Sequence, residues 1–190
     1  QVVEVLSGQG VAPRLATREY FEKRGGIPAT GVESAAVPAA FDACLTLLDR
    51  YGTLRLADVS VPTLRLLDRA QVAWHPLLAR SLRRLIDAES HGGGDRSRGL
   101  RLAADYFYRG PLGRELAQWC ETNGGLIRAE DLATHVTRVE EPLHIGYRGH
   151  EVYKCGVWTQ GAYLLQTLGL LEEFNLTKLG HNQPETIHVV

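Results

Sequence analysis

Histidine can ligate a metal or act as a general base, so the positions of the histidines are compared first with the spacings of known metal sites. The seven histidines are His75, His91, His135, His144, His150, His181 and His188. A helical zinc motif would pair two histidines four residues apart, and mixed sites place cysteine near histidine. Neither pattern occurs, so the local sequence predicts no metal site.

Carboxylate pairs and nucleophiles are present, but not in the arrangement that catalysis needs. Glu140 and Glu141 are adjacent before Pro142, and neighbouring strand residues point to opposite faces, so we interpret them as a loop before a strand. Cys120 with a distant histidine stays open as a thiol pair, although a buried thiol is the simpler interpretation. Three hydroxyl residues are expected in loops, but none stands in a Gly-x-Ser-x-Gly nucleophile elbow: Ser34, Ser60 and Thr159.

Gly8, Gln9 and Gly10 follow an expected strand at residues 2–6. A dinucleotide-binding loop would need its third glycine at position 13, where Pro13 stands. We therefore interpret this segment as a tight loop whose backbone comes close to another part of the chain. We expect no organic cofactor.

Bulk composition indicates an ordinary globular domain. The chain has 190 residues, 44% hydrophobic and 23% charged, with a net charge of −1. The basic residues are dispersed, which argues against a nucleic-acid partner, and no apolar run reaches the ~20 residues of a membrane span. Cys44, Cys120 and Cys155 are odd in number, and the first two lie on apolar helix faces, which predicts buried free thiols.

Helices dominate the elements that must position these residues. Apolar residues repeat every three to four positions over 37–51, 56–70 and 76–89, with Pro62 marking a kink or a break in the second segment. The Gly-rich stretch at 90–97 is predicted to be a flexible surface loop. Further helices are expected at 15–23, 99–108, 112–121, 130–133 and 161–174.

The period changes to two near residue 143. Leu143, Ile145 and Tyr147 alternate with smaller or polar residues, Arg148 and Gly149 form a turn, and residues 150–155 run back. This pattern predicts a β-hairpin near 143–155. The fold class is therefore α+β, mostly helical.

Short motifs follow one another in a fixed order along nearly the whole chain. Ala12-Pro13 is followed by Ala16-Thr17, and Val37-Pro38 opens a helix that ends at Tyr51-Gly52. Further motifs stand at 61–66, 107–110, 123–127, 130–133, 146–153 and 165–172. In their order and spacing these residues resemble the large-subunit region of the γ-glutamyltransferase family.

The resemblance implies an N-terminal-nucleophile hydrolase fold, an αββα sandwich made as a precursor that cleaves itself. The new N-terminal threonine would be nucleophile and, through its amine, general base. It would break γ-glutamyl amide bonds, as in glutathione, and pass the acyl group to water or an amine. We expect residues 1–190 to form one partial domain of a longer precursor, inactive without the small subunit that carries the threonine. Exposed strand edges and apolar faces of such a piece would favour self-association.

One departure from the family concerns substrate recognition. In well-studied members of the family, an arginine ahead of the Ala-Pro turn pairs with the α-carboxylate of the γ-glutamyl group; Gln9 stands at the matching position here. An amide cannot neutralise a carboxylate as a guanidinium does. Arg14 lies close in sequence and is the candidate replacement. Gln9 and Arg14 are thus the candidate substrate-binding residues, and no catalytic residue is expected in this chain.

Two alternatives stay open at this stage. Because of Gln9, the complete protein could be a related acylase or amidase with a different acyl specificity. It could also be a non-catalytic helical interaction module.

Overall fold

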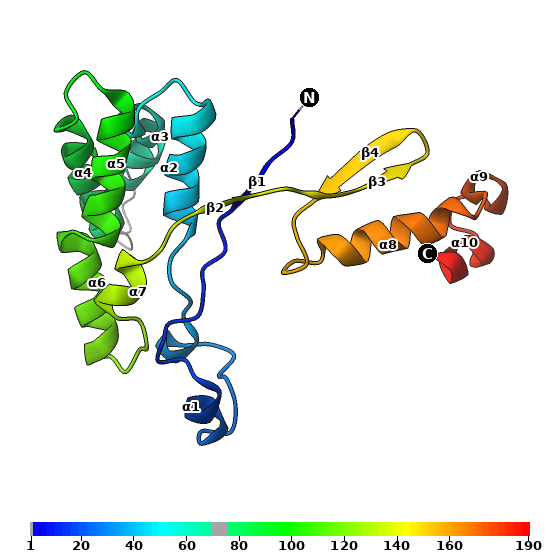
Figure 1. Cartoon of the computed structure of the whole chain (residues 1–190), viewed down its shortest axis with the longest axis horizontal. Helices are drawn as coiled ribbons and strands as arrows, with labels where there is room; N and C mark the ends of the chain where they lie inside the picture. The colour runs from blue at the N-terminus through cyan, green and yellow to red at the C-terminus, as the bar shows by residue number, and fades with distance from the viewer. Residues whose placement is uncertain (1, 70–75) are drawn as a thin grey trace. The chain divides into compact units, whose positions relative to one another are not determined.

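The computed structural model of the chain describes residues 2–69 and 76–190. It divides into two compact units (Figure 1). The helical unit runs from Gly8 to Thr137, and the hairpin unit joins the residues up to Ser7 with Arg138–Val190. The sequence predicts that residues 1–190 form one partial domain, and this stays a prediction.

The helical unit is built around one central helix, α5, which contacts α2, α4, α6 and α7 (Figure 1). The helices expected from the apolar periodicity are present, and α3 continues through Pro62 without a break. The elements are α1 (Arg18–Glu22), the 3₁₀ helix η1 (Val32–Ser34), α2 (Ala40–Tyr51), α3 (Leu56–Arg69), α4 (Pro76–Ser90), α5 (Arg96–Tyr108), α6 (Pro111–Thr122) and α7 (Ala129–Ala133). The predicted helix end at residue 70 lies outside the described residues.

Two apolar clusters hold these helices together. The first contains Leu45, Leu56, Leu85, Leu100 and Ala103, from four successive helices, α2 to α5. The second is formed by Val37, Tyr108, Ala117, Cys120, Ile127 and Leu132. Burial of such side chains stabilises the fold by about 1.5–3 kcal/mol each for the larger ones. Cys120 is buried as predicted, but the prediction for Cys44 is wrong. The buried face of α2 centres on Leu45, and Cys44 lies on its exposed flank.

A tight turn joins α4 to α5 in the stretch that the sequence predicts to be flexible. Successive backbone hydrogen bonds close it, including one from Gly92 N–H to the Glu89 carbonyl at 2.9 Å. The Asp95 carboxylate then accepts from the Arg98 N–H at 2.9 Å and caps α5. The flexibility of residues 90–97 stays a prediction.

The hairpin unit contains the predicted hairpin and a second strand pair, of which the sequence predicts only the first strand, at residues 2–6. Strands β3 (Leu143–Tyr147) and β4 (His150–Lys154) pair in antiparallel register, with Tyr147 opposite His150. Arg148 and Gly149 both have positive φ, 49° and 81°, as a two-residue I′ turn requires. Helix α8 (Gly161–Glu172) contacts both strands. Helices α9 (Leu176–Leu179) and α10 (Pro184–Val189) complete the unit.

Strands β1 (Val5–Ser7) and β2 (Arg138–Glu140) form the second, antiparallel pair of the hairpin unit, with Leu6 opposite Val139. Glu140 therefore ends a strand, whereas the sequence suggests a loop there. It also accepts a hydrogen bond from the Trp158 indole N–H at 2.8 Å.

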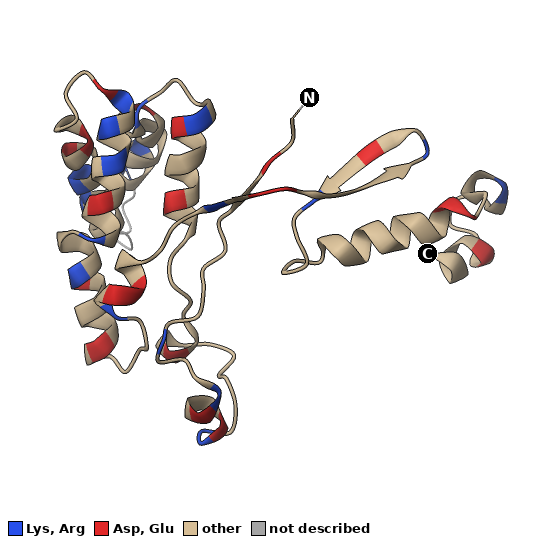
Figure 2. Cartoon of the chain, viewed as in Figure 1, with Lys and Arg blue, Asp and Glu red and all other residues tan. Residues whose placement is uncertain are grey.

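Charged residues are unevenly distributed. Both signs are spread over the helices of the helical unit, while α8 carries no lysine or arginine and has a single acid, Glu172, at its end (Figure 2). No helix within residues 2–69 and 76–190 has the length and apolar character needed to cross a bilayer.

Candidate functional site

The loop that carries Gln9 is held against the segment that leads into α2. The Val37 N–H donates to the Val11 carbonyl at 3.0 Å. A Cβ atom added at Gly10 would lie 1.9 Å from the Val37 carbonyl oxygen, far inside van der Waals contact. Only glycine allows this approach, which confirms the predicted tight loop. The backbone next to Gln9 is thereby held close to Val37.

Arg14 is held from the other direction by Asp131 of α7. The buried Asp131 carboxylate accepts the Arg14 backbone N–H at 3.1 Å, and its other oxygen accepts the Arg128 N–H at 2.9 Å. The Arg14 Nε lies 3.4 Å from the same carboxylate, while the Arg14 side chain stays 66% exposed. Asp131 therefore caps α7 and anchors the Ala-Pro turn with one side chain.

The two predicted site residues lie in the same loop but differ in surroundings. Gln9 is exposed, and Arg14 carries an acidic partner while keeping donors open to solvent. Within the part of the chain that the structure describes, no hydrogen bond joins Gln9 to Arg14. Their role in substrate binding stays a prediction.

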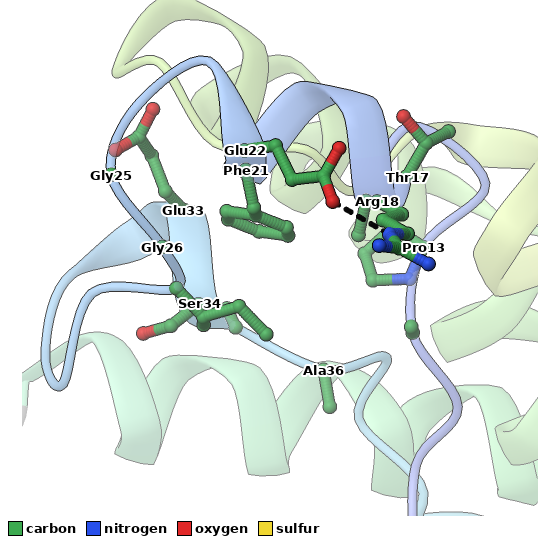
Figure 3. A pocket seen from close by; sticks show the side chains of 14 residues that line it. Pro13, Thr17, Arg18, Phe21, Glu22, Gly25, Gly26, Glu33, Ser34 and Ala36 are labelled. Carbon is green, nitrogen blue, oxygen red and sulfur yellow. Dashed lines mark hydrogen bonds and ion pairs between the residues drawn. The ribbon is translucent and has the colours of Figure 1, made fainter.

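A pocket of about 700 Å³ begins at the Ala-Pro turn (Figure 3). The ring of Phe21, a buried residue of α1, points into it. Most of its wall consists of small or apolar residues: Ala12, Pro13, Ala16, Gly25, Gly26, Ile27, Ala35 and Ala36. Sequence reasoning missed this pocket, because the alanines and glycines of residues 12–36 carry no periodic signal.

Charged side chains around the pocket are paired with one another. Arg18 Nε lies 2.6 Å from Glu22 Oε1, the contact drawn as a dashed line in Figure 3. Arg24 lies 3.6 Å from Glu33 and stacks over the Tyr20 ring at 3.8 Å. The Tyr20 hydroxyl donates to Glu33 at 2.6 Å, and this hydrogen bond is the main reason that the Tyr20 pKa is raised. The rim thus presents neutralised pairs.

The hydroxyl groups at the pocket serve the local backbone. Thr17 Oγ1 accepts the Tyr20 N–H at 3.1 Å and caps α1, and the Ser34 hydroxyl donates to the Gly31 carbonyl at 3.0 Å. Among the described residues, neither hydroxyl is hydrogen-bonded to a histidine or a carboxylate. Across residues 2–69 and 76–190, no group of three or more histidine, cysteine or acidic side chains could hold a metal ion.

A second set of polar groups is buried where the helical unit ends. The Tyr108 hydroxyl donates to the Pro38 carbonyl at 2.9 Å and accepts the Asp42 N–H at 3.1 Å. The His135 ring stacks on Tyr108 with centroids 5.1 Å apart, and its Nε2 lies 3.9 Å from the Asp42 carboxylate. No hydrogen-bond partner for this buried nitrogen is found among the described residues.

Burial sets the protonation of both aromatic residues. It raises the pKa of Tyr108 to about 12. It lowers the pKa of His135, with Asp42 opposing the shift and Arg109 adding to it. Both groups are therefore neutral near pH 7 and act as packing elements. No local spacing could have joined these residues, because they are far apart in sequence.

Comparison with known proteins identifies the family. The family described as Gamma-glutamyltranspeptidase matches residues 1–73 and 69–190. The chain belongs to the gamma-glutamyltranspeptidase family. The resemblance read from the sequence motifs is confirmed.

Relatives of the family include both hydrolases of glutathione and acylases. The chain is 29% identical to the acylase ACY 1 proenzyme of Pseudomonas sp. (strain SE83), over 98% of this chain and 40% of that protein. It is 28% identical to the glutathione hydrolase-like YwrD proenzyme of Bacillus subtilis, over 100% of this chain and 41% of that protein. The chain thus spans about 40% of the length of these relatives.

A solved relative confirms the fold class. The chain is 27% identical in sequence to cephalosporin acylase from Bacillus halodurans, whose crystal structure superposes with a TM-score of 0.75. The match covers 97% of this chain and 40% of the acylase chain. The mostly helical α+β fold of an N-terminal-nucleophile hydrolase, with its hairpin, is the fold expected from the sequence.

Proposed function

We propose that this chain is the large-subunit region of an amide-bond acyltransferase or hydrolase of the gamma-glutamyltranspeptidase type. The family match along the entire chain carries the proposal. Relatives named as proenzymes support a precursor that is processed into two parts. The complete protein would cleave γ-glutamyl amides such as glutathione and transfer the acyl group to water or an amine, with an N-terminal threonine of the small subunit as nucleophile.

The large-subunit region supplies scaffold and substrate contacts in this proposal. Gln9 and Arg14 lie on a loop fixed at one end by the Gly10–Val37 contact and at the other by Asp131. Such rigid support is what holds a substrate near the productive geometry. The chain by itself would have no amidase activity. Measurable turnover of an anilide substrate by the purified 190-residue chain would contradict this point.

Gln9 favours a second candidate, an acylase that does not require a free α-carboxylate. The test is to assay the full-length protein on γ-glutamyl-p-nitroanilide and on 4-aminobutyryl-p-nitroanilide, which lacks only that carboxylate. A γ-glutamyl enzyme should prefer the first substrate clearly. Equal or reversed preference would favour the acylase over the γ-glutamyl enzyme, and turnover of neither substrate would exclude both of these acyl specificities.

A Gln9→Arg variant sharpens this test. Restoring a charge-assisted contact worth about 1.5–3 kcal/mol would raise the preference for γ-glutamyl-p-nitroanilide roughly 10- to 150-fold. Gln166→Arg is the matched control, because it adds the same charge at an exposed position of α8. An equal effect of the two variants would exclude a local role for position 9.

A further inference from the structure

We propose that the pocket lined by Pro13, Phe21 and Ile27 is a subsite for an uncharged apolar group of the substrate, aromatic or branched aliphatic. The inference rests on the proposed function insofar as the ligand is a substrate. It adds a subsite beside Gln9 and Arg14 that neither residue forms. The ligand class follows from the size, the wall and the charge balance of the pocket.

The size and wall of the pocket suit a small organic group. A volume of about 700 Å³ lies within the range of ~300–1,000 Å³ typical of ligand sites. Such sites combine an apolar lining with a few polar groups. The Phe21 ring supplies a flat apolar surface. It is itself held by an edge-on contact with the Tyr20 ring, with the ring centroids 5.1 Å apart. An aromatic group placed on that surface would gain apolar burial and ring contact.

The charge balance around the pocket argues against an anionic occupant, and its apolar wall argues against a charged occupant of either sign. Each of the three arginines in residues 14–24 already faces an acid: Arg14 faces Asp131, Arg18 faces Glu22, and Arg24 faces Glu33. A carboxylate entering the pocket would have to compete with Glu22 and Glu33, which both line it. Like charges brought that close disfavour binding. A neutral group meets no such cost.

The pocket also lies where a substrate would reach it. Ala12 and Pro13 line the pocket and belong to the same short loop as Gln9. A substrate whose polar end lies at Gln9 or Arg14 can therefore place an apolar extension over the Ala-Pro turn. The pocket thus selects the apolar part of the substrate by size and polarity, while the loop with Gln9 and Arg14 selects its polar end.

Two fluorescent probes that differ by one sulfonate test this inference on the full-length protein. N-phenyl-1-naphthylamine is neutral, and 1-anilinonaphthalene-8-sulfonate is its anionic counterpart; both brighten in apolar surroundings. The neutral probe should bind at least about tenfold more tightly. Absence of binding by the neutral probe, for instance because another segment fills the pocket, would overturn the proposal, as would equal affinity for the two.

Variants localise the probe without touching the core. Ile27→Ser should weaken the neutral probe about fivefold, since Ile27 is 70% exposed in the free protein and would be covered on binding. Ile187→Ser is the matched control, because Ile187 is 64% exposed in the hairpin unit and lines no part of this pocket. Equal effects of the two variants would refute the assignment.

Removal of one acid tests the charge argument separately. Glu22→Gln frees Arg18 and should strengthen the anionic probe about two- to fivefold, with the neutral probe unchanged. A parallel change in both probes would show that the ion pair does not govern selection. These measurements need no turnover, so they can fail or succeed independently of the anilide assays.

Discussion

The Asp42 carboxylate accepts two hydrogen bonds from Thr137, one from the backbone N–H at 2.8 Å and one from the hydroxyl at 2.6 Å. The two residues are 95 positions apart in sequence. Asp42 lies in the first turn of α2, and Thr137 is the last residue of the helical unit before β2 begins. The contact therefore fixes the point where the chain leaves the helices.

Removal of the Thr137 hydroxyl should destabilise the protein. Thr137→Val keeps the backbone N–H bond and deletes the hydroxyl bond to a charged acceptor, which is worth about 1.5–3 kcal/mol. We expect a lower free energy of unfolding in urea titrations of the full-length protein. Thr53→Val, at an exposed position, is the control and should change little. Equal stability of the two variants would show that the Asp42 contact contributes nothing net.

Mutations of Asp131 and Arg14 should differ in their effect on stability, although the two residues are in contact. Asp131→Ala leaves the backbone N–H groups of Arg14 and Arg128 without their acceptor, at a cost of about 2–3 kcal/mol in unfolding free energy. Arg14→Ala removes only an exposed ion pair and should cost about 1 kcal/mol or less. If Arg14 binds substrate, its variant raises KM with no more than this small loss of stability. A large loss of stability in Arg14→Ala would contradict this division.

The turn between α4 and α5 offers a matched pair of glycines. A Cβ added at Gly92 would lie 2.5 Å from the Gly99 backbone, whereas one added at Gly94 would meet open space. Gly92→Ala should therefore destabilise the protein by about 1–3 kcal/mol through overpacking, and Gly94→Ala should be close to neutral. Thermal unfolding of both variants checks this. Similar midpoints would indicate that the turn yields, as a flexible loop would.

The helices and the hairpin were predictable because their signals are local. The stripe at Leu45 and Leu48 and the alternation from Leu143 to Tyr147 each lie within one element, so period and turn chemistry sufficed. The strand pair β1–β2 was only half predictable. Each strand has three residues, and the pairing of Leu6 with Val139 joins the two ends of the sequence.

The candidate site was less predictable than the fold. Gln9 and Arg14 could be named through family motifs, but the acid that holds Arg14 could not, because Asp131 is over a hundred residues away. From sequence, Asp131 suggests only a favourable charge in the first turn of a helix. The pocket was missed for a related reason. Six of its fourteen lining residues are alanine or glycine, whose role is to leave space.

His135 is the residue whose environment best predicts a response to pH. It is buried, stacks on Tyr108 and faces Asp42, and Arg109 is the nearby cation that opposes its protonation. Its pKa in the folded protein is lowered from the ordinary 6.5, with burial as the largest cause. As pH falls through about 6.5, the unfolded chain therefore takes up this proton more readily than the folded chain. Stability that is complete above that pH is lost below it.

The corresponding variant should remove this part of the pH dependence. His135→Phe keeps a ring on Tyr108, cannot be protonated, and deletes the buried Nε2 that lacks a partner within the described residues. We expect its unfolding free energy at pH 7.5 to equal or exceed that of the wild type, and the loss between pH 7.5 and 5.5 to be smaller. Exposed His181 supplies the control as His181→Phe, which should keep the wild-type slope. If the wild type and both variants lose the same unfolding free energy between pH 7.5 and 5.5, burial of His135 does not cause this pH dependence.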